Sequence, residues 1–134
     1  MKDIFNRKNR LRLWVILFVI GTSLISSCSK EKDTPPSKSH KIIFKATVSD
    51  GSTISNTVYG VDTDITTQSS LSGESWASDE IIAPAGSINA NVSIQALGQD
   101  ADATLTVQIY VDGELKKEGK SMGEILVAQA NYRF

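Results

Sequence analysis

Residues 41–134 are predicted to form an all-β sandwich of about seven short strands. Apolar and polar residues alternate along much of this region, which is the period of a half-buried strand. Turn residues recur where the alternation stops, and the sequence lacks stretches with the 3.6-residue period of an amphipathic helix. Short strands at this spacing predict two packed sheets whose apolar faces point inward.

Three segments alternate most regularly, residues 41–49, 87–97 and 103–111, and are predicted to supply most of the core. Their inward positions are Ile42, Phe44, Ala46, Val48, Ile88, Ala90, Val92, Ile94, Ala96, Leu105, Val107, Ile109 and Val111. Their outward positions are polar and include Asn89, Asn91, Ser93, Gln95, Thr104, Thr106 and Gln108.

Weaker patterns predict the remaining strands near residues 55–61, 64–70, 74–83, 114–119 and 124–133. The pair Asp112-Gly113 separates two of the strand patterns. Such a pair predicts a tight hairpin, because both central residues of the turn need a positive φ.

The first 27 residues have the organisation of a secretion signal. A basic stretch is followed by 13 largely apolar residues, Leu13 to Ile25, and then by Ser26-Ser27-Cys28. The apolar run is short for a membrane span, which needs about 20 residues. Ile25-Ser26-Ser27-Cys28 resembles the lipobox of bacterial lipoproteins, in which the cysteine takes a diacylglycerol on its sulfur before cleavage. We therefore expect residues 1–27 to be a lipoprotein signal helix and Cys28 to be the lipidation site, in preference to an uncleaved signal anchor.

Residues 28–40 are predicted to be the lipidated cysteine and a flexible tether. Pro35-Pro36 favours extended geometry, and the stretch can reach about 40 Å from a bilayer. The charged run Lys30-Glu31-Lys32-Asp33 is similar to the segment that follows the lipidated cysteine in surface lipoproteins of Bacteroidetes. A generic charged spacer is an equal alternative. His40 is expected to be a solvated residue at the end of this tether.

Charge and cysteine usage fit an exported domain. Five of the 14 basic residues but only one of the 15 acidic residues precede Cys28, so the part from Cys28 onward carries a net charge of about −5. An acidic domain lacks the basic footprint of a nucleic-acid-binding protein. The single cysteine cannot form an intrachain disulfide, and lipidation would account for it.

The predicted domain resembles the MmpS family, small membrane-anchored proteins of mycobacteria that accompany large lipid and siderophore exporters. The resemblance rests on Ser75-Trp76, on residues 90–96, and on residues 105–113, ending in Ile-Tyr-Val-Asp-Gly. It covers roughly residues 42–132. It implies an immunoglobulin-like β-sandwich and an accessory role beside a transporter.

The sequence departs from that family at two points. Members often pair a cysteine in the strand before the Asp-Gly turn with one in the last strand, whereas Val107 stands at the first position here and the last strand has no cysteine. Members also usually keep a membrane helix, where this chain has a lipobox. Both departures suggest a distant relative in a Gram-negative envelope with a packed core that is not cross-linked.

The sequence offers little for catalysis. Gly73-Glu74-Ser75-Trp76-Ala77 lacks the final glycine of a nucleophile elbow, and the only histidine is His40. Gly113 to Ser121 has one residue too many between its glycines for a phosphate loop, and is expected to be a charged edge hairpin. We therefore predict no catalytic residue, cofactor or metal site.

Two further features are open to more than one interpretation. The acidic pairs Asp62/Asp64 and Asp100/Asp102 are expected to cap their own turns, with calcium binding as the alternative, which convergence of the two loops would favour. Trp76 is expected to lie in the core, and the alternative is an exposed partner-binding anchor.

These features favour a non-catalytic envelope lipoprotein held to a bacterial membrane by its lipid, with the outer membrane preferred. Its expected partner is a transporter or another envelope protein, not nucleic acid. The alternative is a surface lipoprotein that captures a glycan or a small hydrophobic molecule.

Overall fold

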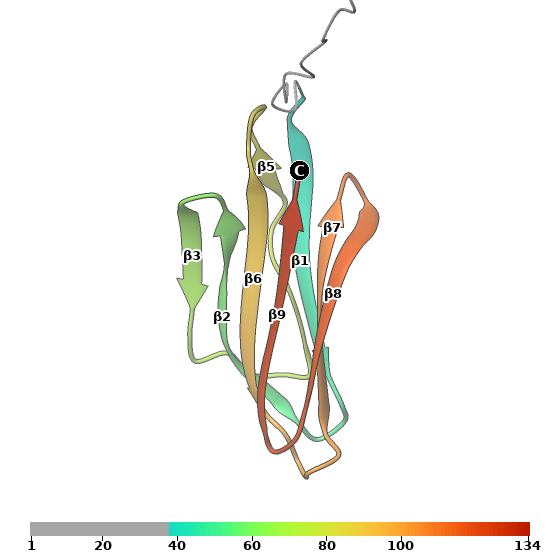
Figure 1. Cartoon of the computed structure of the whole chain (residues 1–134). Coiled ribbons are helices and arrows are strands. Elements are labelled where there is room, and N and C mark those ends of the chain that lie inside the picture. The colour runs from blue at the N-terminus through green and yellow to red at the C-terminus, as the bar shows by residue number, and fades with distance from the viewer. Residues whose placement is uncertain (1–37) are drawn as a thin grey trace, which may run out of the picture. The chain divides into compact units, whose positions relative to one another are not determined.

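The computed structural model describes residues 38–134, which form nine strands in two antiparallel sheets (Figure 1). The predicted all-β sandwich is therefore confirmed, with nine strands where about seven were expected. The strands are β1 (His40–Val48), β2 (Thr53–Val61), β3 (Asp64–Gln68), β4 (Ser75–Ala77), β5 (Ile81–Ala83), β6 (Asn89–Leu97), β7 (Thr104–Val111), β8 (Glu114–Met122) and β9 (Ile125–Arg133). The predicted signal helix, Cys28 and the tether up to residue 37 lie outside the described residues.

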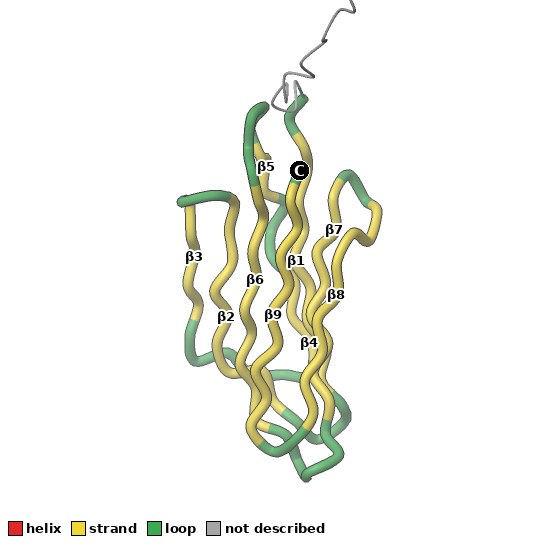
Figure 2. The backbone as a smooth tube through the Cα atoms, in the orientation of Figure 1, coloured by secondary structure: helices red, strands yellow, loops and turns green. Residues whose placement is uncertain are grey.

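One sheet has the order β4-β1-β7-β8, with β5 also pairing with β1, and is called the β1 sheet below. The other has the order β3-β2-β6-β9 and is called the β6 sheet. The chain passes from one sheet to the other after β1, β3, β5, β6 and β8, and the rest of the described region is loop (Figure 2). Residues 38–134 contain no helix able to cross a membrane.

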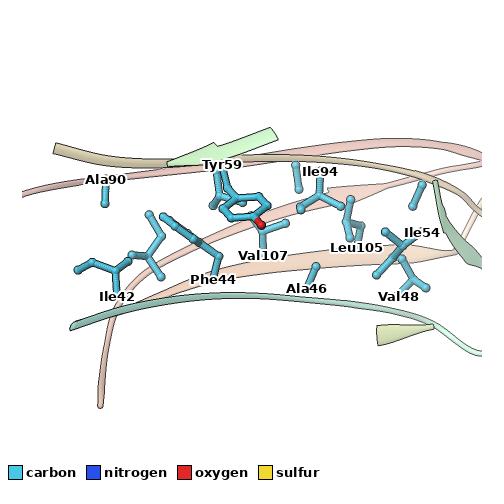
Figure 3. Packing of buried hydrophobic residues seen from close by; sticks show 14 of the residues in the cluster. Ile42, Phe44, Ala46, Val48, Ile54, Tyr59, Ala90, Ile94, Leu105 and Val107 are labelled. Carbon is cyan, nitrogen blue, oxygen red and sulfur yellow. The ribbon is translucent and has the colours of Figure 1, made fainter. Parts of the chain in front are cut away.

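The core fills the space between the sheets (Figure 3). Phe44, Leu105 and Ile109 from the β1 sheet are fully buried, as are Ile54 and Ile94 from the β6 sheet. The alternation predicted for 41–49, 87–97 and 103–111 is confirmed at nearly every inward position, Val107 included. Ile88 is the exception: it precedes the first residue of β6 and is 60% exposed.

The two sheets meet at one side through β8 and β9. Gly119 in β8 faces inward, paired with Val107, and a Cβ there would overlap the carbonyl oxygen of Gln129 in β9. Only glycine therefore allows the two strands to approach so closely. β8 carries the ion pairs Lys116–Glu114 (2.6 Å) and Lys120–Glu118 (3.0 Å), as expected of a charged edge hairpin.

Residues 74–83 were predicted to be one strand, and this was wrong. They form two short strands, β4 and β5, that pair with different parts of β1. Between them the backbone of Ser78 donates to the carbonyl of Phe44, and the Ser78 hydroxyl accepts from the Phe44 amide at 3.0 Å. The hydroxyl replaces a backbone partner, so the edge bulges at Ser78 and the ladder is interrupted.

The Asp112-Gly113 hairpin is confirmed, with φ of 53° and 82°. Asp112 also holds the start of β1, because its carboxylate accepts from the Lys41 amide at 3.0 Å and lies 2.7 Å from Nδ1 of His40. His40 in turn stacks on Phe134, with ring centroids 5.4 Å apart. The expectation that His40 is a solvated tether residue was therefore wrong: it is the first residue of β1.

Candidate binding face

The outer surface of the β6 sheet is almost free of charged side chains. Strand pairing places alternate residues of four strands on this surface. These outward positions, called the amide face below, are Thr53, Asn56, Val58, Gly60, Ile65, Thr67, Asn89, Asn91, Ser93, Gln95, Leu97, Ile125, Val127, Gln129, Asn131 and Arg133. Arg133, at one end, is the only charged residue among them. The outer surface of the β1 sheet differs, since it presents Lys45, Glu118 and Lys120.

Side-chain amides on this face bond to one another, both along β6 and across to its neighbouring strands. Nδ2 of Asn91 donates to Oδ1 of Asn89 at 2.6 Å, and Nδ2 of Asn131 donates to Oδ1 of Asn91. Further along, Nδ2 of Asn56 donates to Oε1 of Gln95 at 3.1 Å. These bonds fix the direction in which each carboxamide presents its remaining donors and acceptors.

Aliphatic residues dominate the opposite end of the amide face. Leu97 and Ile125 are direct cross-strand partners, and their side chains are 60% and 80% exposed. Val127, one position further along β9's outer side, is 47% exposed. Adjacent exposed apolar residues of this kind are typical of an interaction surface.

A shallow hollow of about 380 Å³ lies in the middle of the amide face. Its outward-facing lining is Val58, Ile65, Asn91, Ser93, Gln129 and Asn131. Gly60 shapes this region: a Cβ there would overlap the carbonyl oxygen of Asp64, so its absence lets β3 come close to the outer side of β2. β3 thereby contributes Ile65 as an aliphatic wall.

The two acidic pairs lie at opposite ends of the sandwich, because Asp62 follows β2 beside the first residue of β6, whereas Asp100 follows the last residue of β6. Oδ1 of Asp62 accepts from the amides of Ile88 and Asn89, both at 2.9 Å, and Oδ1 of Asp100 accepts from the Asp102 amide at 2.9 Å. Asp100 thus caps its own turn, as expected. Asp62 does not: its carboxylate instead joins the turn after β2 to the start of β6, 26 and 27 residues away. The two loops do not converge, so the arrangement that would have favoured calcium is not present in residues 38–134.

The hydrogen bonds to Asp62 make stability dependent on pH. The amides of Asn89 and Ile88 hold the pKa of the Asp62 carboxyl below its usual value. Because the pKa of Asp62 is lower in the folded than in the unfolded chain, its ionised carboxylate stabilises the fold above the unfolded pKa of about 3.9. This stabilisation is lost as the pH falls through the pKa of the folded protein. We expect Asp62→Asn to lower Tm at neutral pH and to reduce the fall in Tm on acidification, measured by circular dichroism.

Asp50→Asn is the matched control, since the Asp50 carboxylate is exposed at a turn and accepts no hydrogen bond from residues 38–134. It should leave the acid-dependent fall in Tm close to that of the wild type. Equal pH profiles for Asp62→Asn and the wild type would contradict the role given to Asp62.

Trp76 lies between the two sheets, on the side away from β8 and β9. Its Nε1 donates to Oε1 of Gln68 in β3 at 3.0 Å, and its ring packs 5.0 Å from that of Tyr59 in β2. Trp76 is half-buried and packs against the core. The expected core position is therefore confirmed, although the residue lies at the margin of the core. Ser75, in contrast, is exposed and pairs with Thr47, while His40 is at the other end of β1.

The described residues thus form a small antiparallel β-sandwich, and one of its two outer faces is nearly free of charged side chains. No protein-family model and no curated protein sequence matches this chain. The resemblance to MmpS proteins therefore stays a prediction from the sequence, as does lipidation of Cys28, which lies outside the described residues.

Proposed function

We propose that this protein is a non-catalytic lipoprotein of the bacterial cell envelope that binds a partner protein as an accessory to a transporter. Cys28 would carry the lipid anchor, with the outer membrane as the preferred location. The observation that carries the partner-binding role is the aliphatic end of the amide face, where Leu97, Ile125 and Val127 are exposed side by side. Exposed apolar residues that lie side by side often mark a protein-interaction site.

The edge of the β6 sheet formed by β3, on the side away from β9, gives further support. β3 pairs with β2 on one side only, and Asp64 to Gln68 contains neither lysine nor proline. These are the residues that commonly guard an edge against pairing with another chain. An extended segment of a partner could add to this edge while contacting the amide face.

A second candidate function, capture of a small ligand, is favoured by the hollow in the same face. Its volume of about 380 Å³ falls within the range of small-molecule sites. Its lining combines aliphatic and amide groups, so it offers both apolar contact and directed hydrogen bonds.

Cross-linking in intact envelope membranes, followed by mass spectrometry, tests the leading proposal. We expect a transporter component to cross-link to the wild type and this product to fall at least about tenfold with Ile125→Glu, because burying an unpaired carboxylate against a partner is costly. Ile82→Glu, which alters a residue 53% exposed on the β1 sheet, is the matched control and should leave the product unchanged.

Cys28→Ser in the same cells tests the anchor. It should abolish palmitate labelling and move the protein from the membrane to the soluble fraction. Labelling that persists in Cys28→Ser would contradict the lipidation site. Absence of any transporter component among the cross-linked proteins, or an equal loss with both glutamate variants, would contradict the accessory role.

A further inference from the structure

The hollow in the amide face is lined without any charged side chain. The residues around it are Val58, Ile65, Asn91, Ser93, Gln129 and Asn131, together with inward-facing core residues. An ionic ligand would lose hydration there without gaining a partner of opposite charge, which is unfavourable. The site therefore selects for a neutral ligand.

The polar groups of the hollow are carboxamides and one hydroxyl. Each carboxamide has two N–H donors and an oxygen with two lone pairs. Asn131 uses one N–H on Asn91, and Asn91 uses one N–H on Asn89, so each keeps donor and acceptor capacity on the same side of the sheet. A ligand that fits this lining must itself both donate and accept at several adjacent positions.

The apolar part of the hollow is aliphatic and lies to one side. Val58 is 40% exposed and Ile65 is 48% exposed, and these come from the two strands farthest from β9. The amides of Asn131 and Gln129 come from β9 itself. The lining is thus two-sided, with a C–H-rich wall on one side and hydrogen-bonding groups on the other.

A second cavity, beside an acidic cluster, is a poorer match for such a ligand. It measures about 390 Å³ and lies beside Asp62, Asp64 and the loop from Pro84 to Ser87. The Asp62 carboxylate there is already committed to the amides of Ile88 and Asn89.

We propose that the hollow of the amide face binds a neutral glycan, a proposal that rests on the ligand-capture function above. Sugar hydroxyls both donate and accept, which matches the free capacity of the Asn91, Asn131 and Gln129 amides. The C–H face of a pyranose ring packs against Val58 and Ile65. The shallow, open form of the hollow accommodates a few residues of a longer chain.

Calorimetric titration of the full-length lipidated protein in detergent micelles tests this proposal. The probes are maltohexaose, cellohexaose and mannohexaose, with hexagalacturonate as an anionic counterpart. At least one neutral hexasaccharide should bind, and hexagalacturonate should bind at least about tenfold more weakly, the ratio that corresponds to 1.4 kcal/mol.

Asn131→Ala and Asn56→Ala form a matched pair of variants. Each removes an amide that donates to another amide of the same face, but only Asn131 lines the hollow. Asn131→Ala should weaken binding by about five- to tenfold, the loss expected for one or two hydrogen bonds. Asn56→Ala should bind as the wild type does.

The glycan proposal is overturned if no neutral hexasaccharide binds, if the anionic one binds as tightly, or if the two variants lose affinity equally. A second experiment distinguishes failure of the glycan proposal from failure of the ligand-capture function. It measures saturation-transfer NMR with 1-naphthol, which is not a sugar, on the wild type and on Asn131→Ala. A 1-naphthol signal that depends on Asn131 without sugar binding overturns the glycan and keeps ligand capture. Absence of both signals overturns ligand capture as well.

Discussion

Phe44→Ala is expected to lower the free energy of unfolding by about 3–5 kcal/mol, the usual cost of removing a fully buried aromatic side chain. Phe44 is 0% exposed and lies near the middle of β1. Its ring packs 5.5 Å from that of Tyr59, which belongs to the opposite sheet (Figure 3). Alanine would therefore leave a cavity in the core between the two sheets.

Urea denaturation of the wild type and the variant measures this loss. Ile82→Ala is the control, because Ile82 is 53% exposed and its truncation should change stability by less than about 0.5 kcal/mol. A loss below about 1 kcal/mol for Phe44→Ala would mean that the core collapses around the missing ring, and that Phe44 does not join the sheets as described.

Gly60→Ala is expected to cost about 1–3 kcal/mol and to loosen β3. The added methyl group would overlap the Asp64 carbonyl oxygen and lie 2.9 Å from the carbonyl carbon. Both atoms are backbone, so β3 itself must move. The wall that Ile65 gives to the hollow would move with it, so any ligand of the hollow should bind more weakly.

Amide hydrogen exchange locates this effect. Faster exchange is expected at residues of β3 in Gly60→Ala. Gly123→Ala is the control: Gly123 has a φ of 131° and open space around its Cβ position, so its strain should stay in the turn between β8 and β9. Unchanged exchange in β3 would show that Gly60 does not set its position.

The sequence predicted well those strands whose two faces differ sharply. β1, β6 and β7 alternate cleanly, and their bounds agree with the predictions to within one or two residues. The interruption at Ser78 could not be predicted, because its hydroxyl bonds to the Phe44 amide, a partner 34 residues away. His40 was misjudged for the same reason, since its partner Asp112 is 72 residues away.

The amide face was visible in the sequence only in part. The polar series Asn89, Asn91, Ser93 and Gln95 was recognised as the outer side of one strand. It becomes a face only because β6 pairs with β9 on one side and with β2 on the other. Neither pairing is between neighbours in the chain, so local patterns do not reveal which polar faces will be joined.

The stacking of His40 on Phe134 places the first residue of β1 beside the last residue of the chain. A short peptide could therefore join the two without bending either sheet. Opening the chain instead at the turn containing Gly123, where the Cβ position is unobstructed, would give a circular permutant with the same two sheets. Any tether added to the new terminus would leave from the opposite end of the sandwich. Comparing ligand binding by the native chain and by the permutant would then show whether binding depends on the amide face alone or also on the end of the sandwich from which the tether leaves.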